Sequence, residues 1–142
     1  DENSWGLEAS LELSGHCALV LDIHHHWIKT GEYIQPDDDR VKRVIGSWRG
    51  VRPTMHYSLC REDILVDHNP TMLPDMDALL SLGFKKAKLR AHSDMCWNTA
   101  CNDWALSFGP NFDIMVEAKL KNLAQHQLYK QYRKNLLNYC HK

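Results

Sequence analysis

The sequence predicts an α/β fold in which parallel strands alternate with helices. Two observations support this prediction. Segments typical of strands recur between helical segments along the 142 residues, and an acid or a histidine comes at or just after the end of each predicted strand. Alternation of this kind favours parallel strands joined by helices, and ligands then gather at the carboxyl edge of the sheet. We therefore expect these side chains to meet in one site.

The first two elements are a helix and a buried strand. Residues 4–14 place Leu7 and Leu11 four positions apart, which is typical of a short amphipathic helix, and Gly15 ends it. Residues 17–22 are an apolar run closed by an acid, which predicts a buried strand.

The second helix and strand follow a loop. Residues 37–39 are three aspartates that can cap a helix reaching about Trp48, because carboxylates favour the positive end of a helix dipole. Gly50 closes that helix. Residues 52–58 are predicted to form the next strand, which ends at His56.

A third helix and strand are predicted in the middle of the chain. After a polar stretch, residues 76–82 are expected to be helical and to end at Gly83. In residues 86–92 polar and apolar residues alternate, which indicates a strand that carries His92 at its end.

The last third of the sequence repeats the pattern. Residues 93–106 are predicted to be helical, and the Gly-Pro pair at 109–110 is a break. Residues 112–117 are predicted as a strand that ends at Glu117, and residues 119–140 as a long helix.

The predicted strand ends provide ligands for a metal. Histidine nitrogens with carboxylates suit zinc or manganese in an open catalytic site, and four or more such ligands could hold two ions for phosphodiester cleavage. Within the run 22–26, Asp22 and His25 are the expected ligands, and His24 and His26 are expected to flank or orient them. The full predicted ligand set is Asp22, His25, His56, His92 and Glu117.

Composition limits the compartment and the partners. The chain has 17 Lys and Arg against 18 Asp and Glu, so it lacks the global positive field that drives sequence-independent binding to nucleic acid. Its five cysteines are irregularly spaced and are interpreted as free thiols. Because no signal peptide or long apolar segment is present, we expect a cytoplasmic, intracellular protein with no membrane partner, and a nucleoid-associated one in the case of a DNA substrate.

The motifs carry a resemblance to a known family. An Asp-x-x-His, a His-x-Ser, a His-Ser-Asp and an Asp-x-Met-x-Glu-Ala-Lys motif occur in this order. Together they resemble the second half of the UV damage endonuclease family, which is similar to endonuclease IV and to the sugar isomerase barrels. The motifs lie at residues 22–25, 56–58, 92–94 and 113–119.

The resemblance implies a fold and an activity. It implies approximately the second half of a TIM-type (β/α) barrel and an enzyme that nicks damaged double-stranded DNA beside UV photoproducts. The same five ligands would hold divalent metal, most often manganese, with zinc as the other candidate, and His56 and Glu117 would be catalytic. Local basic residues and one tryptophan are the predicted DNA contacts, namely Lys85, Lys86, Lys88, Arg90, Lys119 and Trp27.

The chain departs from the family pattern in two residues and in length. The family's further ligand Glu would fall just upstream of Asp1, with Glu2 as a stand-in, and Thr54 occupies the position of a modified lysine. A complete barrel takes about 250 residues, so residues 1–142 are interpreted as a single domain or a fragment. We expect it to need the missing amino-terminal half of the barrel or a second copy, and to be weak or inactive alone.

Two other functions fit the same residues. A sugar isomerase-like barrel would use similar ligands on a ketose or aldose and ignore DNA. A non-catalytic metal-binding or interaction module would use the histidines for stability, so that a chelator lowers its melting temperature.

Overall fold

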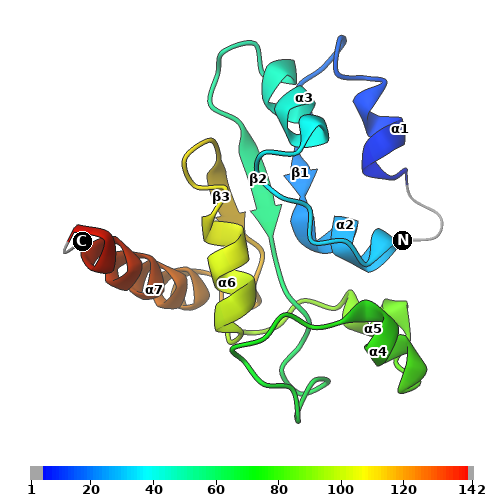
Figure 1. Ribbon diagram of the computed structural model, residues 1–142, viewed down its shortest axis with the longest axis vertical. Helices are drawn as coiled ribbons and strands as arrows, with labels where there is room; N and C mark the ends of the chain where they lie inside the picture. The colour runs from blue at the N-terminus through cyan, green and yellow to red at the C-terminus, as the bar shows by residue number, and fades with distance from the viewer. Residues whose placement is uncertain (1–4, 141–142) are drawn as a thin grey trace.

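A three-stranded parallel sheet forms the centre of the computed structural model, which describes residues 5–140 and the side chains of residues 5–134. The strands lie in the order β1-β2-β3, and their arrows point the same way in Figure 1. They are β1 (Leu21–Asp22), β2 (Thr54–Tyr57) and β3 (Asp113–Val116). The α/β prediction is confirmed; closure into a barrel, and the division of the chain into domains, stay predictions.

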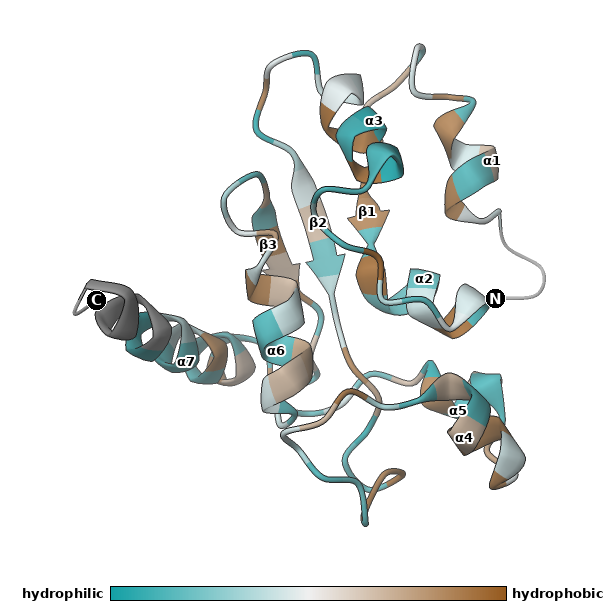
Figure 2. Cartoon of the chain, viewed as in Figure 1, coloured by the Kyte–Doolittle hydropathy of each residue, from teal (hydrophilic) through white to brown (hydrophobic). Residues whose placement is uncertain are grey.

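Helices lie around the sheet and beyond its carboxyl edge. In Figure 1, α1 and α3 lie on the side of β1, α6 lies in front of β3, and α4 and α5 lie past the strand ends. Helix α7 projects away from the sheet, and its coloured part in Figure 2 is mainly hydrophilic. The helices are α1 (Leu7–Leu11), α2 (Ile23–Thr30), α3 (Asp39–Ser47), α4 (Met76–Ser81), α5 (Lys86–Leu89), α6 (Thr99–Leu106) and α7 (Asn122–Cys140).

Several predicted boundaries are confirmed. Asp38 is the N-cap of α3, where its side chain accepts a hydrogen bond from the Arg40 N–H at 2.8 Å. Gly83 follows α4 with a φ of 90°, a left-handed conformation that favours glycine. The side chains of residues 135–140 of the predicted tail helix lie outside the described part of the chain.

The first strand is shorter than predicted. Of residues 17–22 only the last two belong to β1, and Val20 is exposed. The reason lies in the backbone of Leu19, whose N–H donates to Ser47 Oγ at 2.9 Å and whose carbonyl accepts from Trp48 Nε1 at 2.7 Å. Side chains at the end of α3 thus take the hydrogen bonds that a neighbouring strand would have made.

The predicted strand over residues 86–92 is wrong. Residues 86–89 form α5, with Leu89 fully buried in the core. Lys86 Nζ donates to the carbonyl of Lys29 at 2.9 Å, so α5 is held against the last turn of α2. His92 lies instead in an isolated antiparallel bridge with Cys60.

The core lies between the sheet and the helices that follow its strands. Met55 and Tyr57 of β2 are fully buried, and Tyr57 donates from its hydroxyl to Asn102 Oδ1 of α6 at 2.7 Å. Asn102 in turn donates to Gln131 Oε1 at 2.9 Å, which fixes α7 against α6. No described helix is long and apolar enough to cross a membrane.

Candidate metal centre

Three side chains that the sequence predicts as ligands converge at the carboxyl edge of the sheet. One atom each from Asp22, His56 and Glu117 lies within 4.8 Å of the others. His56 Nδ1 lies 3.4 Å from Glu117 Oε1 and 3.9 Å from Asp22 Oδ2. All three residues are only partly buried, so that a ligand can reach them.

Strand register accounts for this convergence. Asp22 of β1 pairs with His56 of β2, and the parallel pairing of β2 with β3 runs on to Tyr57 and Val116. The next residue is Glu117, whose N–H donates to the Tyr57 carbonyl at 2.8 Å. The ladder therefore brings Asp22, His56 and Glu117, each at or next to the end of its strand, side by side.

Helix α2 fixes the Asp22 carboxylate. Asp22 is the N-cap of α2, and its Oδ1 accepts a hydrogen bond from the His25 N–H at 2.8 Å. The second oxygen, Oδ2, faces His56. Sequence reasoning did not indicate α2, although the aspartate that begins it is a preferred N-cap residue.

The carboxylates of the site favour a cation. Burial raises the pKa of Asp22 above its usual value, and the neighbouring Glu117 carboxylate raises it further. The hydrogen bond from the His25 N–H and the nearby rings of His25 and His56 act in the opposite direction, but the pKa stays raised. Like charges and desolvation both disfavour the ionised form of a carboxylate, and a bound cation would offset both.

Three histidine rings gather beside the carboxylate group. The ring centroids of His25 and His92 are 5.9 Å apart, and His24 lies 5.9 Å from His25 and 6.0 Å from His92. His25 and His92 are thus neighbours, although they do not belong to the three-residue group. Burial lowers the pKa of His24 to about 3, so this ring is neutral.

The chemistry of the donors fits a hard or borderline divalent ion. Two carboxylates and an imidazole are typical ligands of manganese and of catalytic zinc. Burial raises the pKa of Cys60, Cys96 and Cys101 to between about 11 and about 12, so these thiols are protonated and free. Within the described residues, the group of Asp22, His56 and Glu117 is the one cluster able to hold a metal.

The basic residues among the predicted DNA contacts divide into two groups. Lys85, Lys88 and Arg90 are exposed and stay candidates. Lys86 and Lys119 are engaged within the chain, the first at the Lys29 carbonyl and the second with Asp94 Oδ1 at 3.6 Å.

The burial of Trp27 does not favour its predicted stacking on bases. Its side chain is only 3% exposed and packs in the core against His24 and Tyr33, so it offers no free ring face. Glu2, the candidate replacement for the upstream ligand, lies outside the described residues. Thr54 lies on β2 and has no amine that could be modified as the family lysine is.

Comparison with known proteins decides the family. A family profile described as UV-endonuclease UvdE matches residues 1–140. The chain belongs to the UvdE family. A UV-damage endonuclease of Schizosaccharomyces pombe (strain 972 / ATCC 24843) is 29% identical over 139 residues, which cover 93% of this chain.

The chain corresponds to a small part of that relative. The aligned residues cover 19% of the yeast protein, so this UvdE chain spans about a fifth of the length of the curated relative it matches. No solved structure matches it. The family resemblance expected from the four motifs is confirmed.

Proposed function

We propose that this UvdE chain supplies part of the metal centre of an endonuclease that cuts DNA beside UV photoproducts. The observation that carries the proposal is the convergence of Asp22, His56 and Glu117 within 4.8 Å in a member of the UV-endonuclease family. The similar yeast protein is named a UV-damage endonuclease. Damaged double-stranded DNA is the proposed substrate.

Asp22, His56 and Glu117 are the proposed ligands of a divalent ion, with manganese preferred over zinc. His25 and His92, whose rings are 5.9 Å apart, would complete the coordination from the side of α2 and the segment after α5. A divalent cation bound there would lower the pKa of a water and neutralise charge on the scissile phosphate.

Protein groups would orient the reactants around that ion. Hydrogen bonding to the His25 N–H fixes one oxygen of Asp22, so its other oxygen stays directed at the site. His56 Nδ1 and Glu117 Oε1 lie 3.4 Å apart, so as ligands of one ion both would border the water that the ion activates. These two residues are the proposed catalytic pair.

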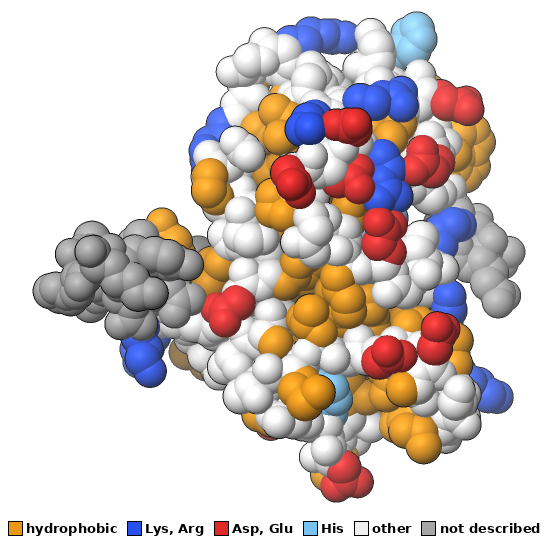
Figure 3. All heavy atoms as spheres, viewed as in Figure 1, with side chains coloured by type: hydrophobic (Ala, Val, Ile, Leu, Met, Phe, Trp, Pro, Cys, Tyr) orange, Lys and Arg blue, Asp and Glu red, His pale blue; other side chains and the backbone are white. Residues whose placement is uncertain are grey.

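The basic segment before His92 would position the DNA backbone. Lys85, Lys88 and Arg90 are exposed on or beside α5, and phosphate contacts of this type hold a duplex without reading its sequence. Figure 3 shows basic and acidic side chains interspersed on the face drawn, so a local contact fits better than a broad basic surface. The free thiols agree with a reducing, intracellular setting for such an enzyme.

The proposed activity needs more protein than this sheet. β1 and β3 are the outer strands of the three-stranded sheet, and each has one edge that no described strand covers. Open strand edges favour pairing with another segment or chain. We propose that the amino-terminal half of a barrel, or a second copy, completes both the sheet and the metal site.

Incision of UV-irradiated supercoiled plasmid with manganese tests this function. The protein from its complete reading frame should nick irradiated plasmid and spare unirradiated plasmid, whereas the 142-residue chain should be much weaker. His56→Ala should lower incision about a hundredfold or more. His16→Ala, an exposed histidine away from the site, is the matched control and should keep full activity.

Two outcomes would overturn the proposal. One is an irradiated plasmid left intact while a ketose or aldose is isomerised, which is the result expected for a sugar isomerase-like enzyme. The other is metal-dependent stability with no incision under any metal, which is the result expected for a non-catalytic module.

A further inference from the structure

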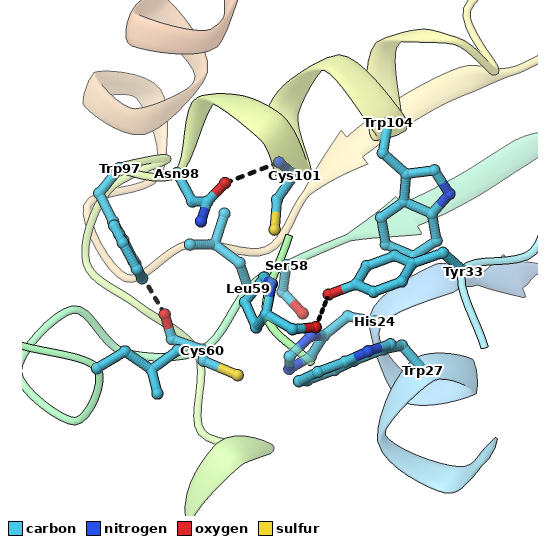
Figure 4. A pocket seen from close by; sticks show the side chains of 12 residues that line it. His24, Trp27, Tyr33, Ser58, Leu59, Cys60, Trp97, Asn98, Cys101 and Trp104 are labelled. Carbon is cyan, nitrogen blue, oxygen red and sulfur yellow. Dashed lines mark hydrogen bonds between the residues drawn. The ribbon is translucent and has the colours of Figure 1, made fainter. Parts of the chain in front are cut away.

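An internal cavity lies between α2 and the chain that follows β2. It has a volume of about 10 Å³, and its walls include His24, Trp27, Tyr33, Ser58, Trp97 and Trp104. Figure 4 shows the stacked rings of His24 and Trp27 on one side of it, with Ser58 and Leu59 above them and Tyr33 beside them. None of the three clustered ligands, Asp22, His56 and Glu117, lines it.

Three polar atoms in this wall are buried without a hydrogen-bond partner among the described residues. They are His24 Nε2, Trp27 Nε1 and Ser58 Oγ, and each side chain belongs to a residue that is at most 4% exposed. Buried polar atoms in native proteins almost always have a partner, because an unpaired one costs free energy. Three of them around one cavity indicate a shared ligand.

The neighbouring polar groups are already paired. The Tyr33 hydroxyl donates to the Pro74 carbonyl at 2.7 Å, and Trp97 Nε1 and Trp104 Nε1 donate to the Cys60 and Ile34 carbonyls at 2.9 Å. Of the lining side chains, those that need a partner are therefore His24, Trp27 and Ser58.

We propose that a single water molecule binds in this cavity and bridges His24, Trp27 and Ser58. A cavity of about 10 Å³ has room for about one water, which is typically held by two to four polar partners. The donors and acceptors match. Trp27 Nε1–H can only donate, the Ser58 hydroxyl can do either, and His24 Nε2 can accept because the ring's other nitrogen is directed at the backbone of Leu89 and Arg90.

The water joins two segments that carry proposed metal ligands. His24 precedes His25 on α2, and Ser58 comes two residues after His56 at the end of β2. The water site itself does not depend on the proposed nuclease function, because it forms in the metal-free chain.

A crystal structure of the metal-free chain tests the proposal directly. We expect one density peak at about 2.7–3.2 Å from all three atoms, with no anomalous signal. A dry cavity, or an anomalous peak that identifies a metal, would overturn the proposal. Loss of plasmid incision with the water present would instead count only against the nuclease function.

Unfolding measurements provide a second, independent test. Trp27→Phe and Ser58→Ala should each lower stability, and the double variant should lose less than the sum, because the water is already lost in each single variant. Trp27→Phe combined with Ser47→Ala is the control, since the buried Ser47 hydroxyl bonds Val44 and Leu19 outside the cavity. The control pair should be additive; strict additivity in the Trp27 and Ser58 pair would contradict a shared water.

Discussion

At the scale of single residues, Asp22 has two structural roles. One carboxylate oxygen caps α2 through the His25 N–H, and the other faces His56 in the candidate metal site. The two roles make different demands, because capping needs only an oxygen acceptor whereas metal binding needs the negative charge. Substitutions at this position can therefore separate folding from metal binding.

Asp22→Asn and Asp22→Ala should differ in the metal-free chain. We expect Asp22→Asn to change the free energy of unfolding by less than about 0.5 kcal/mol, because the amide oxygen still caps α2 and a desolvated carboxylate is removed. Asp22→Ala should lose about 1 kcal/mol with the cap. Urea denaturation measures both; equal losses would mean that capping by Asp22 contributes little.

A second prediction concerns the ion pairs of Arg40. Arg40 donates to Asp38 Oδ2 at 2.7 Å and to Glu32 Oε1 at 2.6 Å. The hydrogen bonds from Arg40 to Asp38 hold the pKa of Asp38 at about 2, below its usual 3.8. Because the pKa is lower in the folded state, this pair stabilises the fold above about pH 4 and is lost as the pH falls towards 2. Asp38→Asn, which keeps the cap, should lose less stability over that interval than the wild type.

Acid titration of the unfolding free energy checks this expectation. Asp37→Asn is the control, since Asp37 is exposed and does not cap α3. It should follow the wild-type curve. A wild-type slope between pH 4 and pH 2 that Asp38→Asn leaves unchanged would count against the pair.

At the scale of elements, the strands that end at the site are easier to predict from the sequence than the helices between them. Residues 52–58 and 112–117 contain β2 and β3, because turn signals and apolar residues bound both segments. Residues 86–92 were misassigned because the alternation of lysine with apolar residues has the period of a strand. In the structure, tertiary contacts override this local strand preference, because Leu89 packs in the core and Lys86 bonds to the end of α2.

The candidate site was predictable in part for the same reason. Asp22, His56 and Glu117 meet because parallel strands align their carboxyl ends, which sequence alone indicates. His92 lies near His25 by a route the sequence did not indicate, an antiparallel bridge to Cys60. The burial of Trp27 was also unpredictable, because its place depends on the unforeseen helix α2.

The end of α2 offers a test of the packing between elements. Gly31 ends α2 with a φ of 77°, and a Cβ there would lie 3.3 Å from the Met76 Cβ of α4. Gly31→Ala should therefore cost about 1–2 kcal/mol through left-handed strain and crowding. Gly15→Ala, where a Cβ would meet nothing within 4 Å, should change stability by less than about 0.5 kcal/mol, as thermal unfolding can measure. Equal effects of the two variants would contradict this packing.

At the scale of the whole molecule, the sheet determines where the candidate site lies. Three parallel strands bring two carboxylates and an imidazole together at one edge of the sheet, while β1 and β3 leave outer edges open among the described residues. A metal that binds only the folded chain stabilises it by mass action. Binding of a metal to this chain can thus be measured through its stability, with no other protein present.

Calorimetric titration of the chain with manganese is the most direct test of the central claim. We predict saturable binding by the wild type, and at least about a tenfold loss of affinity in His56→Ala and in Glu117→Gln, because each removes one of the converging ligands. His16→Ala should bind as the wild type does. Binding that is unchanged in both site variants, or no binding by the wild type at millimolar manganese, would contradict the account.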